Sequence, residues 1–231
     1  MIRTVAETGS TNADLADLAR NGAGEGLWLR AERQTAGKGR QGRAWQSPIG
    51  NLYISTLVRL RPSDPSPATL ALVAAVALEE AVGAFDVGVT LKWPNDLMID
   101  GAKLSGILLE RVGDAVVLGF GVNLAEHPED LDRAATSLAT RIAAPDPGIF
   151  AETLAEAFAR WLGRWRGEGL VAVRERWLAR AHAPGTALTA RLADGSSVDG
   201  LFEGLTQEGA LILRLADGAR HVIHAADVFL L

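Results

Sequence analysis

The sequence predicts an α+β protein, in which helices flank a mixed, largely antiparallel sheet and a small β barrel follows. Tight-turn pairs such as Asp100-Gly101 and Gly113-Asp114 separate consecutive apolar runs, as in hairpins of an antiparallel sheet. Longer segments with helical spacing stand before and after these runs. From Pro184 onward the pattern changes to short alternating runs between Asp-Gly and Glu-Gly turns. We therefore expect two domains, residues 1–183 and residues 184–231.

The elements of the first domain are expected in the following order. Ser10 and Thr11 suit the start of a short helix over 12–20, and Asn21-Gly22 suits its end. After the proline-rich break at 61–67, residues 68–82 are rich in Ala, Leu and Val and predict a helix that lies against the sheet. Strands are expected over 27–32, 51–60, 87–92, 97–99, 103–111 and 115–122.

Two further helices and a set of short strands are expected in the remainder. Residues 149–166 and 170–181 have helical spacing, with Trp161, Trp165 and Trp177 as apolar anchors, and Pro147 suits the start of the first. These helices are expected to cover the sheet. The barrel strands are expected over 187–192, 197–205, 210–215 and 221–228.

Composition limits the possible functions of the 231 residues. Hydrophobic residues make up 48% and charged residues 22%, which is ordinary for a globular protein. The absence of cysteine excludes disulfides, thiolate nucleophiles and Cys-based zinc sites, and is compatible with a reducing cytoplasm. The N-terminus does not have the pattern of a signal peptide, so we expect a cytoplasmic protein. The net charge of -5 argues against a mainly electrostatic nucleic-acid surface.

A glycine-rich basic loop is the first candidate site. Residues 37–42, Gly-Lys-Gly-Arg-Gln-Gly, match the GxGxxG pattern, but Pro48 and Gly50 interrupt the chain where a dinucleotide-binding fold needs a helix, and no acid follows about 20 residues on. A Walker loop also fails, because Gly39 stands where Ser or Thr is required. The loop is instead expected to wrap an anion such as a phosphate chain with its backbone N–H groups and cations, namely Arg33, Lys38, Arg40 and Arg43.

The second candidate site is a pair of lysines that bracket an apolar hairpin. Lys92 precedes Trp93-Pro94-Asn95-Asp96, and Lys103 begins the next apolar run. A charged amine in such surroundings needs an anionic or strongly polar partner, and Lys103 is the stronger candidate for a functional role. The histidines, His127, His182, His221 and His224, do not suggest a metal site and are expected to be structural or exposed.

Four separated motifs carry a family resemblance. They are Glu7-Thr8-Gly9-Ser10-Thr11-Asn12, residues 34–43 (Gln-Thr-Ala-Gly-Lys-Gly-Arg-Gln-Gly-Arg), Lys92-Trp93-Pro94-Asn95-Asp96 and residues 119–124 (Gly-Phe-Gly-Val-Asn-Leu). Their order and spacing resemble those of biotin protein ligases. The resemblance implies a class II synthetase-like catalytic domain and an SH3-like C-terminal barrel. It also implies ATP-dependent activation of biotin to biotinyl-5'-AMP and transfer of biotin to a lysine of a biotin carboxyl carrier protein.

The resemblance assigns roles residue by residue. The expected catalytic residues are Lys103, Arg40 and Asp96: the resemblance places Lys103 and Arg40 at the activated intermediate, and Asp96 is the candidate carboxylate to orient the carrier lysine or accept its proton. The implied biotin site consists of Ser10, Thr11, Asn12, Gln34, Lys38, Gly39, Arg40, Lys103 and Gly106. The implied nucleotide site consists of Lys38, Arg40, Arg43, Trp45, Asn95, Asp96, Lys103 and Asn123. Mg²⁺ is expected to accompany ATP, and no metal-binding residues are assigned.

Two departures and three alternatives accompany this interpretation. Lys38 stands where many relatives have arginine, so the bidentate fork is lost there. Six residues precede Glu7, so the DNA-binding domain and repressor function of some members are not expected. The alternatives are a lipoate protein ligase, a non-catalytic biotin or nucleotide sensor, and an adaptor that binds through its barrel. The expected partner is a carboxylase carrier domain, with no membrane or nucleic acid, and a homodimer is possible.

Overall fold

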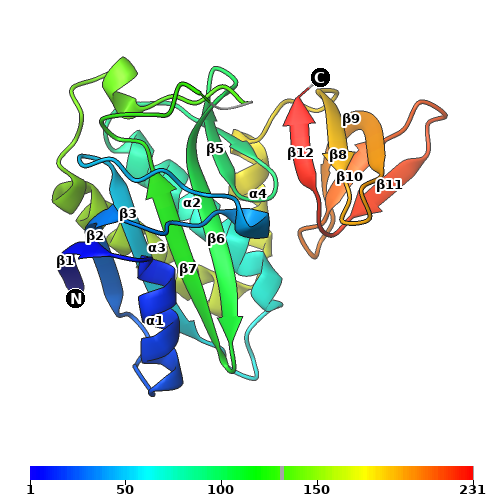
Figure 1. The fold of residues 1–231 in the computed structure, drawn as a ribbon. Coiled ribbons are helices and arrows are strands. Elements are labelled where there is room, and N and C mark those ends of the chain that lie inside the picture. The colour runs from blue at the N-terminus through cyan, green and yellow to red at the C-terminus, as the bar shows by residue number, and fades with distance from the viewer. Residues whose placement is uncertain (131–132, 231) are drawn as a thin grey trace.

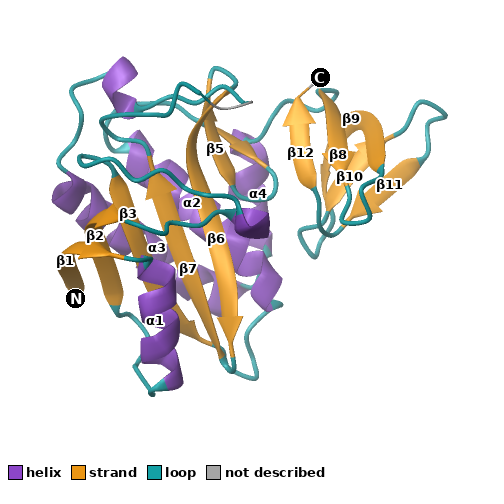
Figure 2. Ribbon diagram, viewed as in Figure 1, coloured by secondary structure: helices purple, strands orange, loops and turns teal. Residues whose placement is uncertain are grey.

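The computed structural model describes residues 1–130 and 133–230, and these form two sheets with helices around the larger one (Figures 1 and 2). The larger sheet and its helices contain β1 Ile2–Thr8, α1 Thr11–Arg20, β2 Trp28–Gln34, β3 Leu52–Arg59, α2 Leu70–Gly83, β4 Thr90–Lys92, β5 Asp96–Ile99, β6 Ala102–Val112, β7 Ala115–Val122, α3 Pro147–Glu168 and α4 Val171–Arg180. The smaller sheet contains β8 Ala187–Arg191, β9 Ser197–Leu205, β10 Leu211–Arg214, β11 Arg220–Ile223 and β12 Asp227–Leu230. The predicted α+β class is confirmed.

The larger sheet has seven strands in the order β1-β2-β3-β7-β6-β5-β4. Its pairs are antiparallel except β1 with β2, which is parallel, so the sheet is mixed as expected. Strand β1 was not predicted. Its side chains are mostly exposed, as expected for an edge strand, and lack the apolar alternation from which the other strands were recognised.

Alternate residues of β7 face opposite sides of the sheet and divide the core in two. Val116 and Val122 belong to the larger apolar cluster, with α2 and α3, whereas Ala115 and Val117 pack with Leu15 of α1. Figure 1 shows α1 crossing the front of the sheet and the other long helices behind it. The front face carries one short helix, so part of it is free to form a site.

The smaller sheet differs from the predicted barrel. Its five strands have the order β11-β10-β9-β8-β12, and β11 and β12 are opposite edges without mutual pairing in the described residues. The predicted single strand over 221–228 is in fact the end of β11 and the start of β12. Four residue steps from Ile223 to Asp227 span at most about 14 Å, whereas a flat five-stranded sheet is about 19 Å wide. The sheet therefore curls strongly but does not close.

Direct contacts join the two sheets. The indole nitrogen of Trp93 donates to the carbonyl of Gly209 at 3.1 Å, and Arg174 of α4 donates to the carbonyls of Leu205 and Thr206. Because backbone acceptors are used, these contacts fix the position of one sheet relative to the other. Within the described residues, no helix is both long and apolar enough to cross a membrane.

Leu78 tests the packing of α2 against the sheet. Its side chain has 0% exposure, so Leu78→Ala removes buried methyl groups and leaves a cavity. We expect the free energy of unfolding to fall by about 2–5 kcal/mol in urea denaturation. Ile149→Ala on α3 is the matched control because Ile149 is 59% exposed and should lose far less stability. Equal losses in the two variants would contradict the packing described.

Candidate active site

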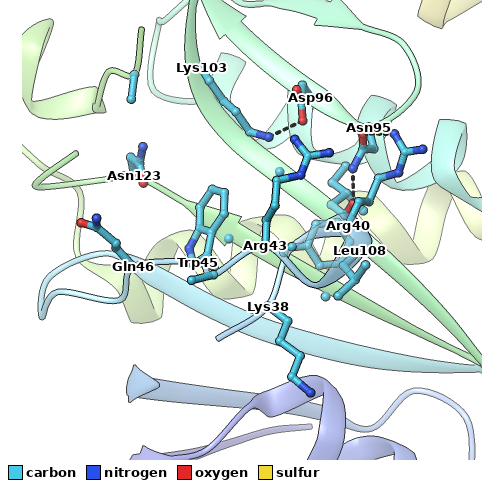
Figure 3. A pocket seen from close by; sticks show the side chains of 18 of the residues that line it. Lys38, Arg40, Arg43, Trp45, Gln46, Asn95, Asp96, Lys103, Leu108 and Asn123 are labelled. Atoms are coloured by element: carbon cyan, nitrogen blue, oxygen red, sulfur yellow. Dashed lines mark hydrogen bonds and ion pairs between the residues drawn. The ribbon is translucent and has the colours of Figure 1, made fainter. Parts of the chain in front are cut away.

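A cavity of about 460 Å³ opens on the front of the larger sheet, beside the N-terminus of α1 (Figure 3). The glycine loop between β2 and β3, the segment around Asn95 and the start of β12 surround it. Every residue that the sequence assigned to the biotin and nucleotide sites lines this cavity: Ser10, Thr11, Asn12, Gln34, Lys38, Gly39, Arg40, Arg43, Trp45, Asn95, Asp96, Lys103, Gly106 and Asn123.

Glycines keep the floor of the cavity clear. Gly119 and Gly121 lie on the face of β7 that Ala115 and Val117 present to α1. A Cβ on Gly121 would stand 2.5 Å from Cε2 of Trp45, and one on Gly119 would collide with the amide of Asn12. A Cβ on Gly106 of β6 would lie 3.1 Å from Lys103 Nζ and 3.2 Å from Cζ3 of Trp45, which is a tight contact but no collision. The glycines therefore allow polar and aromatic side chains to approach the strand backbone closely.

A neutral hydrogen-bonded cluster forms one end of the cavity. Gln34 accepts a hydrogen bond through Oε1 from the backbone N–H of Thr11 at 2.9 Å. Thr11 Oγ1 lies 2.7 Å from Ser55 Oγ, and Ser55 donates to Asn12 Oδ1 at 2.6 Å. Because most of these side chains are buried, their polar atoms must be satisfied by one another or by a ligand. This end suits an uncharged polar group.

A buried carboxylate between two lysines forms a second part. Asp96 Oδ1 is 2.5 Å from Lys103 Nζ, and Asp96 Oδ2 is 3.3 Å from Lys92 Nζ. Burial alone would raise the pKa of Asp96, but the two lysine charges outweigh it and hold that pKa below its usual value. Burial lowers the pKa of Lys92, which Asp96 partly offsets. The expectation that these lysines need an anionic partner is confirmed.

The glycine loop is connected to the smaller sheet through arginines. Arg43 pairs with Asp227 at the start of β12, and Arg40 Nη1 lies 3.4 Å from the same carboxylate. Arg40 also donates to the carbonyl of Ala226 at 3.1 Å. No α-helix follows the loop, which contains a single 3-10 turn at Arg40–Gly42, so the rejection of a dinucleotide-binding fold holds. The loop is held by an antiparallel bridge between Lys38 and Ala44 and by the arginine contacts with the smaller sheet.

The remaining loop cations do not act alike. In Figure 3 the side chain of Lys38 points away from Lys103 and Asp96, and it is exposed. Arg33 was grouped with the loop, but it lies on β2, pairs with Glu7 at 3.3 Å and does not line the cavity. The expectation that Arg33 helps to wrap an anion is therefore wrong for this arrangement.

Trp45 covers the glycine floor. Lys103 Nζ lies 5.7 Å from its ring centroid, within the range of a cation–π contact. Its buried Nε1 has no hydrogen-bond partner among the described residues. A buried donor without a partner is costly, so a ligand acceptor in the cavity would be favoured at this point.

Two charged residues that line the cavity were missed from the sequence. Arg133 follows a polar segment without a recognisable motif, and Asp227 lies more than 180 residues from the arginines it contacts. Together, six cations line the cavity against two carboxylates, the cations being Lys38, Arg40, Arg43, Lys92, Lys103 and Arg133. This excess in a protein of net charge -5 indicates an anionic ligand.

The described residues do not contain a group of three His, Asp or Glu side chains that could hold a metal ion. Asp96 and Asp227 line the cavity, but both are paired with cations. His127 contacts Ser137 Oγ at 3.1 Å, and burial lowers the pKa of His182. The expectation that the histidines are structural or exposed is consistent with these positions.

Comparison with known proteins identifies the family. Residues 8–123 match the model of the biotin/lipoate A/B protein ligase family, and residues 187–231 match the biotin protein ligase C-terminal domain. The chain belongs to the biotin/lipoate A/B protein ligase family. It is 40% identical to biotin–[acetyl-CoA-carboxylase] ligase of Paracoccus denitrificans, over 97% of this chain and 98% of that protein. It is 37% identical to the Mycobacterium tuberculosis protein of the same name, over 97% of this chain and 86% of that one.

Solved structures agree with the fold. Biotin protein ligase from Aquifex aeolicus, in complex with biotin and ATP, superposes with a TM-score of 0.90 at 24% identity, covering 100% of this chain and 99% of that one. The Leishmania major enzyme in complex with biotinyl-5-AMP superposes with a TM-score of 0.68 at 25% identity, covering 97% and 98%. The likeness extends over both sheets, and not over the catalytic domain alone.

Asp96→Asn tests the shared carboxylate. Because the pKa of Asp96 is lowered in the folded protein, the charged form stabilises the fold above about pH 4, and this contribution is lost as the pH falls through the folded-state pKa. The variant leaves two lysines without a counter-charge, so we expect it to be less stable by about 3 kcal/mol at pH 7. The difference should narrow below about pH 4. Urea unfolding across this range measures it, and a constant difference would contradict the assignment.

Gly121→Ala tests the glycine floor. The new methyl group would displace Trp45 and reduce the depth of the cavity. We therefore expect the affinity for the ligand to fall by about tenfold or more while the protein stays folded. Gly88→Ala is the control because its Cβ would meet nothing within 4 Å. Ligand titration by calorimetry and thermal melting measure the two effects. Unchanged affinity in Gly121→Ala would exclude the floor as part of the binding site.

Proposed function

We propose that this chain activates biotin with ATP to biotinyl-5'-AMP and then transfers the biotinyl group to a lysine of a biotin carboxyl carrier protein. The curated relatives named biotin–[acetyl-CoA-carboxylase] ligase support this function at 40% and 37% identity over nearly the whole chain. The solved relatives that hold biotin with ATP, or biotinyl-5-AMP, support the same substrates.

One observation carries the proposal: the cavity has a neutral polar end and a strongly cationic end. The cluster of Thr11, Asn12 and Gln34 suits the uncharged ureido head of biotin, whose N–H and C=O groups need partners once buried. Lys103 and Arg40 belong to the cationic end, which suits the carboxylate of biotin and the phosphates of ATP. Both ends lie within one cavity, as the binding of an acid with a polar head requires.

In the first step, a biotin carboxylate oxygen attacks the α-phosphorus of ATP, an acyl–phosphate bond forms, and pyrophosphate leaves. Negative charge is spread over the phosphate oxygens in the transition state, and fixed cations stabilise it. We assign Lys103 and Arg40 to this role. Asp96 holds Lys103 in place, while Asp227 holds Arg40 from the other sheet. Neither contact uses all the donors of its cation, so both cations can still bind phosphate.

In the second step, the amine of the carrier lysine attacks the mixed anhydride and AMP leaves. The amine has an ordinary pKa of about 10.4 and must lose a proton. Asp96 was expected to orient this amine or to accept its proton. The lowered pKa of Asp96 makes it a weak base, and two lysines already occupy its oxygens. We therefore favour an electrostatic, orienting role for Asp96 and assign no proton acceptor.

Mg²⁺ is expected to accompany ATP, but the lining residues do not form a dedicated site for it. The carboxylates of Asp96 and Asp227 are both engaged with cations. Mg²⁺ commonly keeps several waters and binds through substrate phosphates, so it is expected to arrive with the nucleotide.

The division into residues 1–183 and 184–231 stays part of the proposal, supported by the separate sheets on either side of it; positions 131, 132 and 231 lie outside the described residues. A carboxylase carrier domain is the proposed partner, as in the names of the relatives. We further propose action in the cytoplasm without nucleic acid, in line with the cysteine-free, acidic composition. Pairing of two copies stays a prediction.

Pyrophosphate release tests the function. With ATP and Mg²⁺ present, release should depend on biotin, and mass spectrometry should detect biotinyl-5'-AMP. Because Lys103 supplies charge to the transition state, Lys103→Ala should lower kcat by about 10²–10³-fold. Arg40→Ala should also lower it. Arg3→Ala, which removes an exposed cation of β1, should leave kcat unchanged.

The same assay separates the alternatives. If pyrophosphate release depended on lipoate and not on biotin, lipoate would be the substrate. Binding of biotin or ATP without release would favour the sensor. Release with formation of the adenylate but no transfer to a biotin carboxyl carrier domain would contradict the second step alone.

A further inference from the structure

A carboxylate outside the cavity carries an inference that rests on the proposed function. Glu110 is exposed on β6 and does not line the cavity. Its Oε2 accepts a hydrogen bond from Nδ2 of Asn12 at 2.7 Å. We propose that Glu110 sets the direction of a buried hydrogen-bond chain that ends at Thr11, and so makes the site specific for a ligand that offers an N–H donor there.

The chain runs from Glu110 through Asn12 and Ser55 to Thr11. Ser55 Oγ lies 2.6 Å from Asn12 Oδ1 and 2.7 Å from Thr11 Oγ1. Asn12, Ser55 and Thr11 are 5%, 0% and 3% exposed, so water cannot readily replace a lost partner. Under these conditions the position of each proton is decided by its neighbours.

The direction follows from the number of protons on each group. A carboxylate has no proton to donate, so Asn12 must turn its NH₂ group toward Glu110, where the carbonyl of Leu108 also lies at 3.5 Å. Asn12 Oδ1 then faces Ser55 and can only accept. Ser55 gives its single proton to Asn12 and must itself accept from Thr11. Thr11 Oγ1 also lies 3.2 Å from Gln34 Oε1, but the 2.7 Å contact with Ser55 is the shorter and takes the Thr11 proton, so Oγ1 presents lone pairs to the cavity.

Gln34 supplies the complementary group. Its Oε1 accepts from the backbone N–H of Thr11, which places its NH₂ group on the side of Ser47, at 3.5 Å from that hydroxyl. The NH₂ group has two protons and Ser47 can accept only one of them, so Gln34, which lines the cavity, still has a donor for a ligand, and Thr11 offers an acceptor. A ureido group has both an N–H donor and a carbonyl acceptor, whereas the dithiolane ring of lipoate has neither. The chain thus selects between the two acids of the family through a residue that contacts neither.

Glu110→Lys tests the direction because it replaces an acceptor with a group that can only donate. Asn12 would turn its oxygen outward, and Thr11 would point its proton into the cavity against the ligand N–H. We expect the KM for biotin to rise at least about tenfold, with the KM for ATP changed by less than about twofold. Glu156→Lys makes the same charge change at an exposed position of α3, away from the cavity, and should leave both values unchanged. Glu110→Gln, whose amide can donate or accept, should be intermediate.

A biotin analogue distinguishes a reversed hydrogen-bond chain from a general loss of binding in Glu110→Lys. In a cyclic carbamate analogue, oxygen replaces one ureido N–H, so the wild-type protein should bind it much more weakly than biotin, and Glu110→Lys should lose or reverse that preference in calorimetric titration. An unchanged KM for biotin in Glu110→Lys would overturn the inference, as would equal rises in both KM values. If pyrophosphate release by the wild-type protein did not depend on biotin, the proposed function would be overturned, and the inference with it.

Discussion

The missing side chains at Gly106, Gly119 and Gly121 are the constraint on which the site depends. They lie on the front face of β6 and β7, where the same face nearer the hairpin packs against α1. Apolar burial thus ends where the glycines begin, and the bare strand backbone becomes a floor. Asn12 and Trp45 can reach that floor only because no Cβ is present. The sheet is in this way divided into a packed part and a binding part.

Charge is distributed over the cavity by shared counter-ions. Asp96 serves two lysines and Asp227 serves two arginines, so each carboxylate fixes the position of its cations while a net positive charge remains. Such an arrangement keeps the cations in place before a ligand arrives, which lowers the ordering cost of binding. It also explains why the pKa of Asp96 is lowered although the residue is buried.

Local sequence was sufficient for most of the fold and for the composition of the site. Turn pairs and apolar alternation located β3, β7 and β9 within one or two residues, because these strands are long and bury at least one face. Edge strand β1 was missed because its exposed side chains carry no such pattern. The contact of Arg43 with Asp227 was out of reach, since it depends on the curl of a distant sheet. The direction of the hydrogen bond made by Thr11 Oγ1 could not be predicted from sequence, because it follows from the distances to Ser55 and Asn12.

The pairing of Arg40 and Arg43 with Asp227 gives the molecule a property that neither sheet has alone. The loop that lines the cavity connects β2 and β3 of the larger sheet, and its two arginines bind Asp227 of the smaller sheet. Its position therefore reports the angle between the two sheets. Arg174 of α4 contacts the carbonyls of Leu205 and Thr206 and does not line the cavity, so its substitution would alter the cavity only through that angle. Substitutions in one domain that change this angle would then need compensating substitutions in the other domain to keep the cavity unchanged.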